Sequence, residues 1–193
     1  TDAQGLQSFN ADGFTVGDAN PINHNTKDII SWNWKAGTTT GIATNGSTTI
    51  TPSSYSFNQT AGFSIIKYVG NLTGGAKLAH GLGATPSMVI FKMTNATKDW
   101  LVYHKGMDAT APEDYGISLN TTAARVDETT FWNDTAPDSV NFTLGNTVKV
   151  NGSGDDYIAY CFAEKKGYSK FSDYVGNGNA DGTFVYTGFR PAW

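Results

Sequence analysis

The chain has 193 residues, of which 16% are charged, and its formal net charge is −4. This length suits one domain, or one domain made of two equivalent halves. The pair Lys165-Lys166 is the closest approach to a basic cluster, and no apolar run approaches the ~18 residues that cross a bilayer. We therefore expect no nucleic-acid partner and no membrane insertion.

Short runs of β-branched and aromatic residues, bounded by Gly, Asn, Asp or Pro, predict the strands. Helical periodicity is nearly absent, because no segment of ten or more helix formers carries apolar residues at spacings of three and four. The predicted fold is therefore all-β, an antiparallel β-sandwich of jelly-roll or lectin-like type. In chain order, the clearest strand candidates are residues 29–34, 63–69, 87–92, 100–104, 115–119, 157–163 and 183–186.

Residues 36–60 separate the first two of these candidates and are rich in Gly, Thr, Ser and Asn. A stretch with so few apolar residues predicts a surface loop or a linker.

The chain also contains a diverged copy of itself. Gly13-Phe14-Thr15-Val16-Gly17 recurs as Asn141-Phe142-Thr143-Leu144-Gly145, an offset of 128 residues (142 − 14 = 128). The same offset carries Asn23 onto Asn151, and it carries Ile30, Trp32 and Trp34 onto Ile158, Tyr160 and Phe162. Each of these triplets shares one face of its strand, so the two copies agree in phase.

A second pair of related segments follows, in which residues 63–71 resemble residues 168–177 and Tyr68 falls on Tyr174 (174 − 68 = 106). Beyond it, His80-Gly81-Leu82 with Pro86 resembles Thr187-Gly188-Phe189 with Pro191. We therefore expect two pseudo-repeated halves within one module that covers residues 1–193. The first copy spans about 6–92, an unrepeated insert spans 93–138, and the second copy spans 139–193.

The second copy ends at Trp193, where the first copy continues into its apolar strand at residues 87–92. The last half-module is therefore expected to lack one strand. Either the chain belongs to a longer tandem protein, or a neighbouring subunit supplies that strand by strand addition.

Motifs for catalysis or metal binding are weak. The three histidines form no close-spaced ligand pair, and no Gly-x-Ser-x-Gly elbow is present. Residues 176–182 resemble half of a calcium loop, but the twelfth place is Gly188, where an EF-hand needs Glu, so a hairpin turn is favoured. The single Cys161 lies in an apolar run and is expected to be a small buried residue. We expect no enzyme activity, no metal and no cofactor.

Aromatic residues in the insert are the better candidates for ligand contact. Flat aromatic rings beside Asp, Asn and amide groups are typical of sugar recognition, although core or interface packing is the more ordinary role for Trp and Tyr. The residues predicted to contact a ligand are Trp100, Tyr103, His104, Trp132 and Asp134.

Several distinctive strings run through the chain, among them Trp32-Asn33-Trp34-Lys35-Ala36-Gly37, His80-Gly81-Leu82-Gly83, Tyr157-Ile158-Ala159-Tyr160-Cys161-Phe162-Ala163-Glu164 and Gly167-Tyr168-Ser169-Lys170-Phe171. Together they resemble a repeated module that is common in large virion proteins of marine and cyanobacterial tailed phages. The resemblance covers nearly the whole chain. It implies a tail-fibre, capsid-fibre or adhesin segment with a lectin-like sandwich, and it brings no catalytic residues.

The resemblance, the duplication and the low charge predict a non-enzymatic structural protein of a tailed phage. Such a tail-fibre or capsid-surface module would mediate assembly and attachment to a host surface or its glycans. Its expected location is the virion surface or the extracellular space, and its expected partners are other virion or filament subunits, further copies of itself and host-surface glycans. Two alternatives remain: a self-assembling extracellular filament subunit joined by strand exchange, and a carbohydrate-binding or carbohydrate-active concanavalin-like domain.

Overall fold

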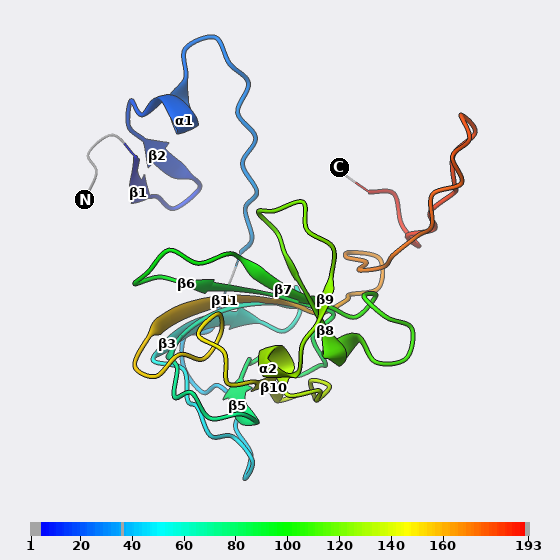
Figure 1. Ribbon diagram of the computed structural model, residues 1–193. Helices are drawn as coiled ribbons and strands as arrows, with labels where there is room; N and C mark the ends of the chain where they lie inside the picture. The colour runs from blue at the N-terminus through cyan, green and yellow to red at the C-terminus, as the bar shows by residue number, and fades with distance from the viewer. Residues whose placement is uncertain (1–4, 36, 192–193) are drawn as a thin grey trace. The chain divides into compact units, whose positions relative to one another are not determined.

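The computed structural model describes residues 5–35 and 37–191 (Figure 1). The chain divides after Trp34 into two parts, which we call unit 1 (Thr1–Trp34) and unit 2 (Lys35–Trp193). Each unit has its own local structure, and strands predominate in both.

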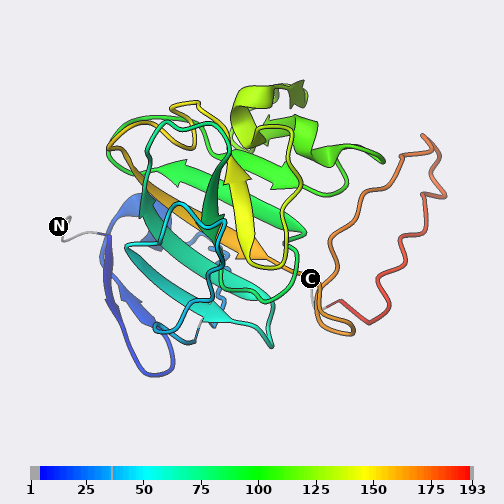
Figure 2. The same cartoon turned by 90° about the horizontal axis from the view of Figure 1, so that it is seen from below.

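A seven-stranded sheet forms the larger layer of unit 2, and all its neighbouring strands are antiparallel. A smaller antiparallel pair, β5 (Ala76–Ala79) and β10 (Asn141–Leu144), lies across one face of this sheet (Figure 2). The predicted all-β sandwich is thus confirmed. In spatial order the large sheet consists of β3 (Ser54–Asn58), β4 (Phe63–Val69), β11 (Asp156–Phe162), β6 (Met88–Met93), β7 (Leu101–His104), β8 (Tyr115–Ser118) and β9 (Val126–Asp127).

Strand β11 is central to this sheet because it pairs with β4 along one edge and with β6 along the other. Its residues alternate: Tyr157, Ala159 and Cys161 are buried, whereas Ile158 and Tyr160 are half-buried on the opposite face. We call the face that carries Tyr157 the inner face and the face that carries Tyr160 the outer face. This alternation is the pattern that correctly predicted the strand.

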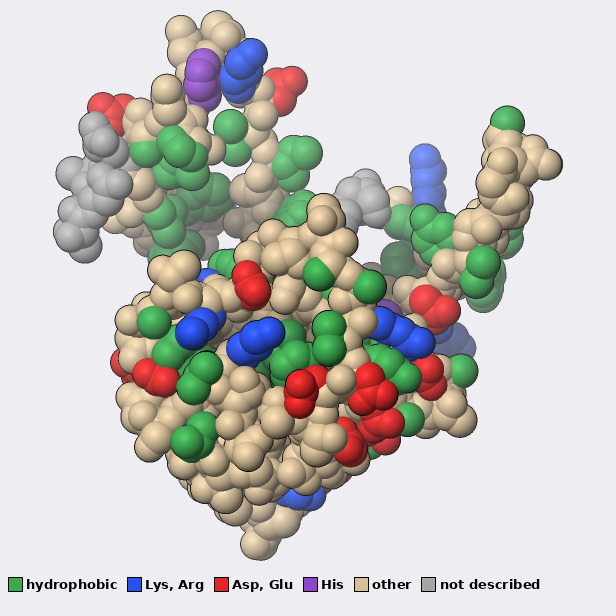
Figure 3. Space-filling model, viewed as in Figure 1, with side chains coloured by type: hydrophobic (Ala, Val, Ile, Leu, Met, Phe, Trp, Pro, Cys, Tyr) green, Lys and Arg blue, Asp and Glu red, His purple; other side chains and the backbone are tan. Residues whose placement is uncertain are grey.

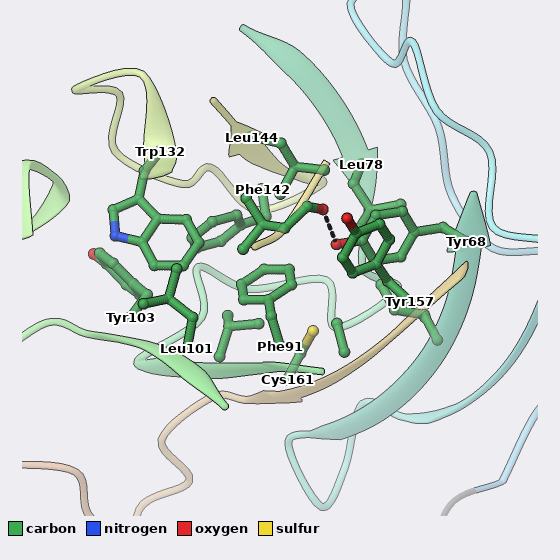
Figure 4. Packing of buried hydrophobic residues seen from close by; sticks show 14 of the residues in the cluster. Tyr68, Leu78, Phe91, Leu101, Tyr103, Trp132, Phe142, Leu144, Tyr157 and Cys161 are labelled. Atoms are coloured by element: carbon green, nitrogen blue, oxygen red, sulfur yellow. Dashed lines mark hydrogen bonds between the residues drawn. The ribbon is translucent and has the colours of Figure 1, made fainter. Parts of the chain in front are cut away.

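The core fills the space between the inner face and the smaller layer (Figure 4). Trp132, from the short helix α2 (Thr129–Trp132), is fully buried there, with ring centroids 5.2 Å from those of Phe91 and Phe142. Tyr68 and Tyr157 stack on each other, and their hydroxyls donate to the carbonyls of Val150 and Val148, both at 2.6 Å. Burying rings of this size contributes about 1.5–3 kcal/mol each, and the hydrogen bonds remove the cost of burying the hydroxyls.

Five of the seven predicted strands are confirmed, as β4, β6, β7, β8 and β11. The predictions for residues 29–34 and 183–186 were wrong, since neither segment forms a strand. The prediction of a loop at 36–60 was wrong for Ser54–Asn58, which form β3. Small polar residues in and around this strand make its alternation of polar and aromatic side chains hard to recognise. Residue 36 lies outside the described residues. A 3-10 turn, η1 (Pro112–Asp114), completes the elements of unit 2.

Unit 1 contains the hairpin of β1 (Leu6–Phe9) and β2 (Phe14–Val16), followed by the single helical turn α1 (Asn20–Asn23). The Asn23 side-chain amide donates to the Gly17 carbonyl at 2.8 Å, and the Asn23 backbone N–H donates to the carbonyl of Ala19 at 2.9 Å.

The same two hydrogen bonds recur 128 residues later, in unit 2. Asn151 donates from its side chain to the Gly145 carbonyl at 2.9 Å and from its backbone to the Thr147 carbonyl at 2.8 Å. The turn at Asn23 and the turn at Asn151 therefore take the same local structure in the two units.

Candidate functional site

The outer face of the large sheet in unit 2 carries a row of half-buried apolar side chains. Alternation places Ile90 of β6, Ile158 and Tyr160 of β11, and Ile117 of β8 on this face. Trp100 lies just before β7 in the same phase as Val102 and His104, so its indole also belongs to the outer face.

Trp100 and Tyr160 form the centre of the candidate site. Their ring centroids lie 6.3 Å apart with an interplanar angle of 24°, so the two rings are stacked and nearly parallel. The Lys92 ammonium lies 6.0 Å from the centroid of the Trp100 ring, at the outer limit for a cation–π contact. Both aromatic side chains remain partly exposed. This pair therefore presents aromatic surface beside a positive charge.

Backbone hydrogen bonds hold Trp100 in place. Its N–H donates to the Asn120 side-chain carbonyl at 2.9 Å, and its carbonyl accepts from the Leu119 N–H at 2.9 Å. The Asn120 amide in turn donates to the Asp99 carboxylate at 3.0 Å. Because both sides of the peptide at Trp100 are tied to the end of β8, the indole starts from a fixed backbone position.

A shallow hollow adjoins the indole and is lined by Lys92, Thr94, Asn95, Lys98, Trp100 and Asn120, among others. Asn95 is anchored on its far side, since its amide donates to the Asp155 carboxylate at 3.2 Å and its carbonyl accepts from the Asp156 N–H at 3.3 Å. The hollow thus combines an aromatic wall with amides, a hydroxyl and two ammonium groups. This combination suits a ligand with one apolar face and several hydroxyls.

The predicted ligand contacts Tyr103 and Trp132 are core residues, with exposed fractions of 3% and 0%. The Trp132 indole N–H donates to the Tyr115 carbonyl at 2.7 Å, which satisfies its polar atom inside the core. Burial, with a smaller contribution from Glu113, raises the pKa of Tyr103 to about 12. Neither side chain offers a surface to a ligand, so the core-packing alternative holds for both.

His104 lies at the opposite end of β7 from Trp100. Its Nδ1 accepts from the Gly106 N–H at 3.0 Å, and its ring centroid lies 6.5 Å from that of Phe171. Burial lowers the pKa of His104, and the neighbouring Lys105 charge adds to this effect. His104 thus packs against the segment that follows β11.

Glu164 holds that segment against the sheet. Its carboxylate accepts from Lys105 at 2.9 Å, from Lys170 at 3.3 Å and from the Phe171 N–H at 2.9 Å. Partial burial raises the pKa of Glu164, but the hydrogen bonds from Lys105 and Phe171 outweigh it and leave the pKa below its ordinary value. The contacts around His104 are therefore structural.

Asp134 belongs to the turn after α2, on the inner side of the sheet, whereas Trp100 lies on the outer side. Its carboxylate accepts from the Thr129 hydroxyl at 2.8 Å. Acidic side chains gather on one side of unit 2 (Figure 3). Desolvation and the nearby charges of Asp134, Asp127, Glu113 and Asp108 raise the pKa of Asp114.

The structure thus does not bring the five predicted site residues together. Trp100 is the one that contributes to the hollow, and sequence reasoning missed Tyr160, Lys92, Asn95 and Asn120. The phase of β11 placed Tyr160 on a face, but only the pairing of β11 with β6 and of β6 with β7 brings it near Trp100.

No group of three or more His, Cys, Asp or Glu side chains within residues 5–35 and 37–191 is arranged to hold a metal ion. The Asn177 loop forms its own hydrogen bonds, with the Asn177 amide donating to the Asp181 carbonyl at 3.0 Å. Cys161 is buried, as predicted, and burial raises its pKa to about 12. None of the helices in the described part of the chain has the length and apolarity that crossing a membrane requires.

Comparison with known proteins places the chain in one family. The model of the family described as Domain of unknown function (DUF7483) matches residues 1–193, so the chain belongs to this family. No curated protein and no solved structure matches the chain.

Proposed function

We propose that this chain is a non-enzymatic attachment module on the surface of a tailed-phage particle, in a tail fibre or on the capsid. It binds host-surface glycans through the Trp100 hollow. The observation that carries the proposal is the partly exposed Trp100–Tyr160 pair beside Asn95 and Asn120. The resemblance to virion modules and the low charge of the chain support the location.

The chemistry of a pyranose ring matches this site. One face of the ring is apolar and packs on an indole, while its hydroxyls exchange hydrogen bonds with side-chain amides and ammonium groups. Asn95 and Asn120 are held by their own hydrogen bonds, so less side-chain entropy is lost when a ligand binds. A shallow hollow gives weak binding in a single copy. Presentation in many copies raises the avidity by about 10²–10⁴.

The test is a glycan array probed with the chain displayed in multiple copies, followed by titration of any hit. We expect Trp100→Ala to abolish binding and Asn95→Ala to weaken it, because the first removes the aromatic wall and the second removes an amide. Trp32→Ala is the matched control, since it removes another exposed Trp, one that lies in unit 1. Binding that survives Trp100→Ala, or an array without hits, would contradict the glycan site.

The virion location is tested separately. Mass spectrometry of purified particles, with antibody labelling in electron micrographs, should find the chain on the particle surface. Its absence from particles that are otherwise complete would contradict the location and leave the glycan site to be judged on the array alone.

A further inference from the structure

Two segments outside the sandwich expose large apolar side chains. In unit 1, Ile30 is 83% exposed, and in the segment after β11, Val175 and Phe184 are 84% and 86% exposed. Figure 3 shows hydrophobic side chains at the surface in both places. Exposed apolar residues in such numbers indicate a surface that a partner covers.

The sequence repeat identifies what unit 1 corresponds to in the sandwich. Strand β2 is the copy of β10, and residues 28–34 are the copy of β11, both at the offset of 128. In β10 the side chains of Phe142 and Leu144 are fully buried, whereas Phe14, the equivalent of Phe142, is 39% exposed. Unit 1 therefore repeats the sequence of two strands of the sandwich, of which β2 forms a strand and residues 28–34 do not.

The strands that pair with β10 and with one edge of β11 in unit 2 are β5 and β4. Their sequence copies lie in the exposed segment after β11. At the offset of 106, β4 corresponds to residues 169–175, and the match of His80 with Thr187 (187 − 80 = 107) makes residues 183–186 the copy of β5. The chain thus carries both members of a second set of partners, and neither copied segment 28–34 nor 183–186 forms a strand.

Backbone hydrogen bonds show that β2 keeps the required edge open. On β10 the carbonyls of Val140 and Leu144 accept from the backbone N–H groups of residues flanking β5. The backbone hydrogen-bonding groups of the even-numbered residues of β10 therefore point toward β5. On β2 it is Gly13 and Gly17, in the opposite phase, that exchange hydrogen bonds with the β1 strand. Strand β1 therefore occupies the other edge of β2. Within the described residues of unit 1, the edge that matches the β5 edge of β10 has no strand.

We propose that residues 169–186 of a second copy of this chain supply two partner strands to unit 1. Residues 183–186 add to the open edge of β2 as β5 adds to β10, and residues 169–175 pair with residues 28–34 as β4 pairs with β11. The register follows from the observed pairs: Phe142↔Leu78 and Thr143↔Lys77 place Val185 opposite Phe14 and Phe184 opposite Thr15. Likewise, Asp156↔Val69 places Val175 opposite Asp28.

The order of the segments favours a second copy over the same chain. In the sandwich, the β4 and β5 segment precedes the β10 and β11 segment. Within one chain, residues 169–186 follow unit 1, which is the reverse of that order. When residues 169–186 of one copy pair with unit 1 of the next copy, the original order is restored along the row of copies. Such a contact joins two different surfaces of the chain, so copies linked in this way form a closed ring, a reciprocal pair included, or an open filament. This inference is independent of glycan binding at Trp100.

Disulfide trapping between two variants tests the register. One chain carries Thr15→Cys and the other carries Phe184→Cys, and both positions are exposed. Thr15 and Phe184 correspond to a pair that is not hydrogen-bonded, with an expected Cα separation of about 4.5 Å, which a disulfide can span. The native Cys161 is buried and its pKa is raised to about 12, so it does not compete near neutral pH. We expect a linked dimer on oxidation that requires both variants.

The matched control pairs Thr15→Cys with Val185→Cys, because a slip of one residue turns the second thiol to the other face of the strand. We expect several-fold less linked dimer in this control. Equal yields from the two mixtures would overturn the register. A single chain carrying both Thr15→Cys and Phe184→Cys that closes its disulfide as a monomer at every concentration would overturn the second copy as the partner.

Discussion

At the scale of single residues, the aromatic side chains of the insert divide between two roles. Trp132 and Tyr103 pack inside the sandwich, whereas Trp100 lies on its outer face. The sequence supports all three equally as ligand contacts, because an aromatic residue suits a core and a binding surface alike. Burial of the side chain decides between the two roles. Which side chains are buried depends on how the sheet, α2 and the smaller layer pack together.

Trp132→Ala tests the role of this residue in the core. Removing an indole that packs against Phe91, Phe142 and Tyr103 leaves a cavity, and we expect a loss of about 3–5 kcal/mol in the free energy of unfolding. Urea titration followed by circular dichroism measures it. Trp32→Ala, at an exposed position, should change the midpoint little. A Trp132 variant as stable as its parent would mean that α2 is not part of the cooperative core.

His80 makes stability depend on pH. It is fully buried, its Nε2 donates to the Asp138 carbonyl at 3.1 Å and its Nδ1 accepts from the Leu82 N–H at 3.2 Å, which fixes a neutral ring. Burial lowers its pKa from the ordinary 6.5, while Asp138 partly opposes the shift. Below pH 6.5, His80 is therefore protonated in the unfolded chain but stays neutral in the folded chain. The free energy of unfolding falls as the pH decreases from 6.5 toward the lowered pKa of His80.

The measurement is the urea midpoint between pH 7.5 and 5.5. His80→Gln should reduce stability at pH 7.5 but flatten the dependence on pH. His104→Gln should keep most of that dependence, because His104 is only half-buried. If both variants retain the full pH dependence, His80 is not its source.

At the scale of elements, the sequence predicted the strands whose apolar residues alternate over a sufficient length. Strand β3 escaped because Ser54, Ser56 and Asn58 alternate with two aromatic residues in a stretch that is otherwise rich in small polar residues. Residues 29–34 and 183–186 have the composition of strands and form none, since a strand exists only where a neighbour accepts its hydrogen bonds. For the same reason the stacking of Tyr160 with Trp100 was not predictable, because strand register is a long-range property.

The repeated Asn turn gives a matched pair of variants. Asn151 is buried, donates to the carbonyls of Thr73 and Gly145, and accepts from the Asn71 N–H, whereas the equivalent Asn23 is exposed. Asn151→Ala leaves these groups without partners and should cost about 1–3 kcal/mol in unit 2. Asn23→Ala should leave the urea midpoint of unit 2 unchanged. Equal effects of the two substitutions would contradict the importance of burial.

At the scale of the whole molecule, every residue of the core cluster lies between Ile42 and Ala163. A chain that starts at Lys35 should therefore keep one cooperative unfolding transition and its glycan binding, yet lose assembly, because it lacks β2 and residues 28–34. Calorimetry and sedimentation at several concentrations measure the two properties. A truncated chain that does not fold, or one that assembles as the full chain does, would contradict this division of roles.

The position of Cys161 makes its thiol a native probe for the opening of the sheet. Its thiol lies on the inner face of β11, the strand with neighbours on both edges, and it is the single cysteine of the chain. A thiol reagent reaches this sulfur only when the central strands separate. The labelling rate in native buffer, compared with that of the unfolded chain, therefore reads the free energy of that opening without an engineered probe.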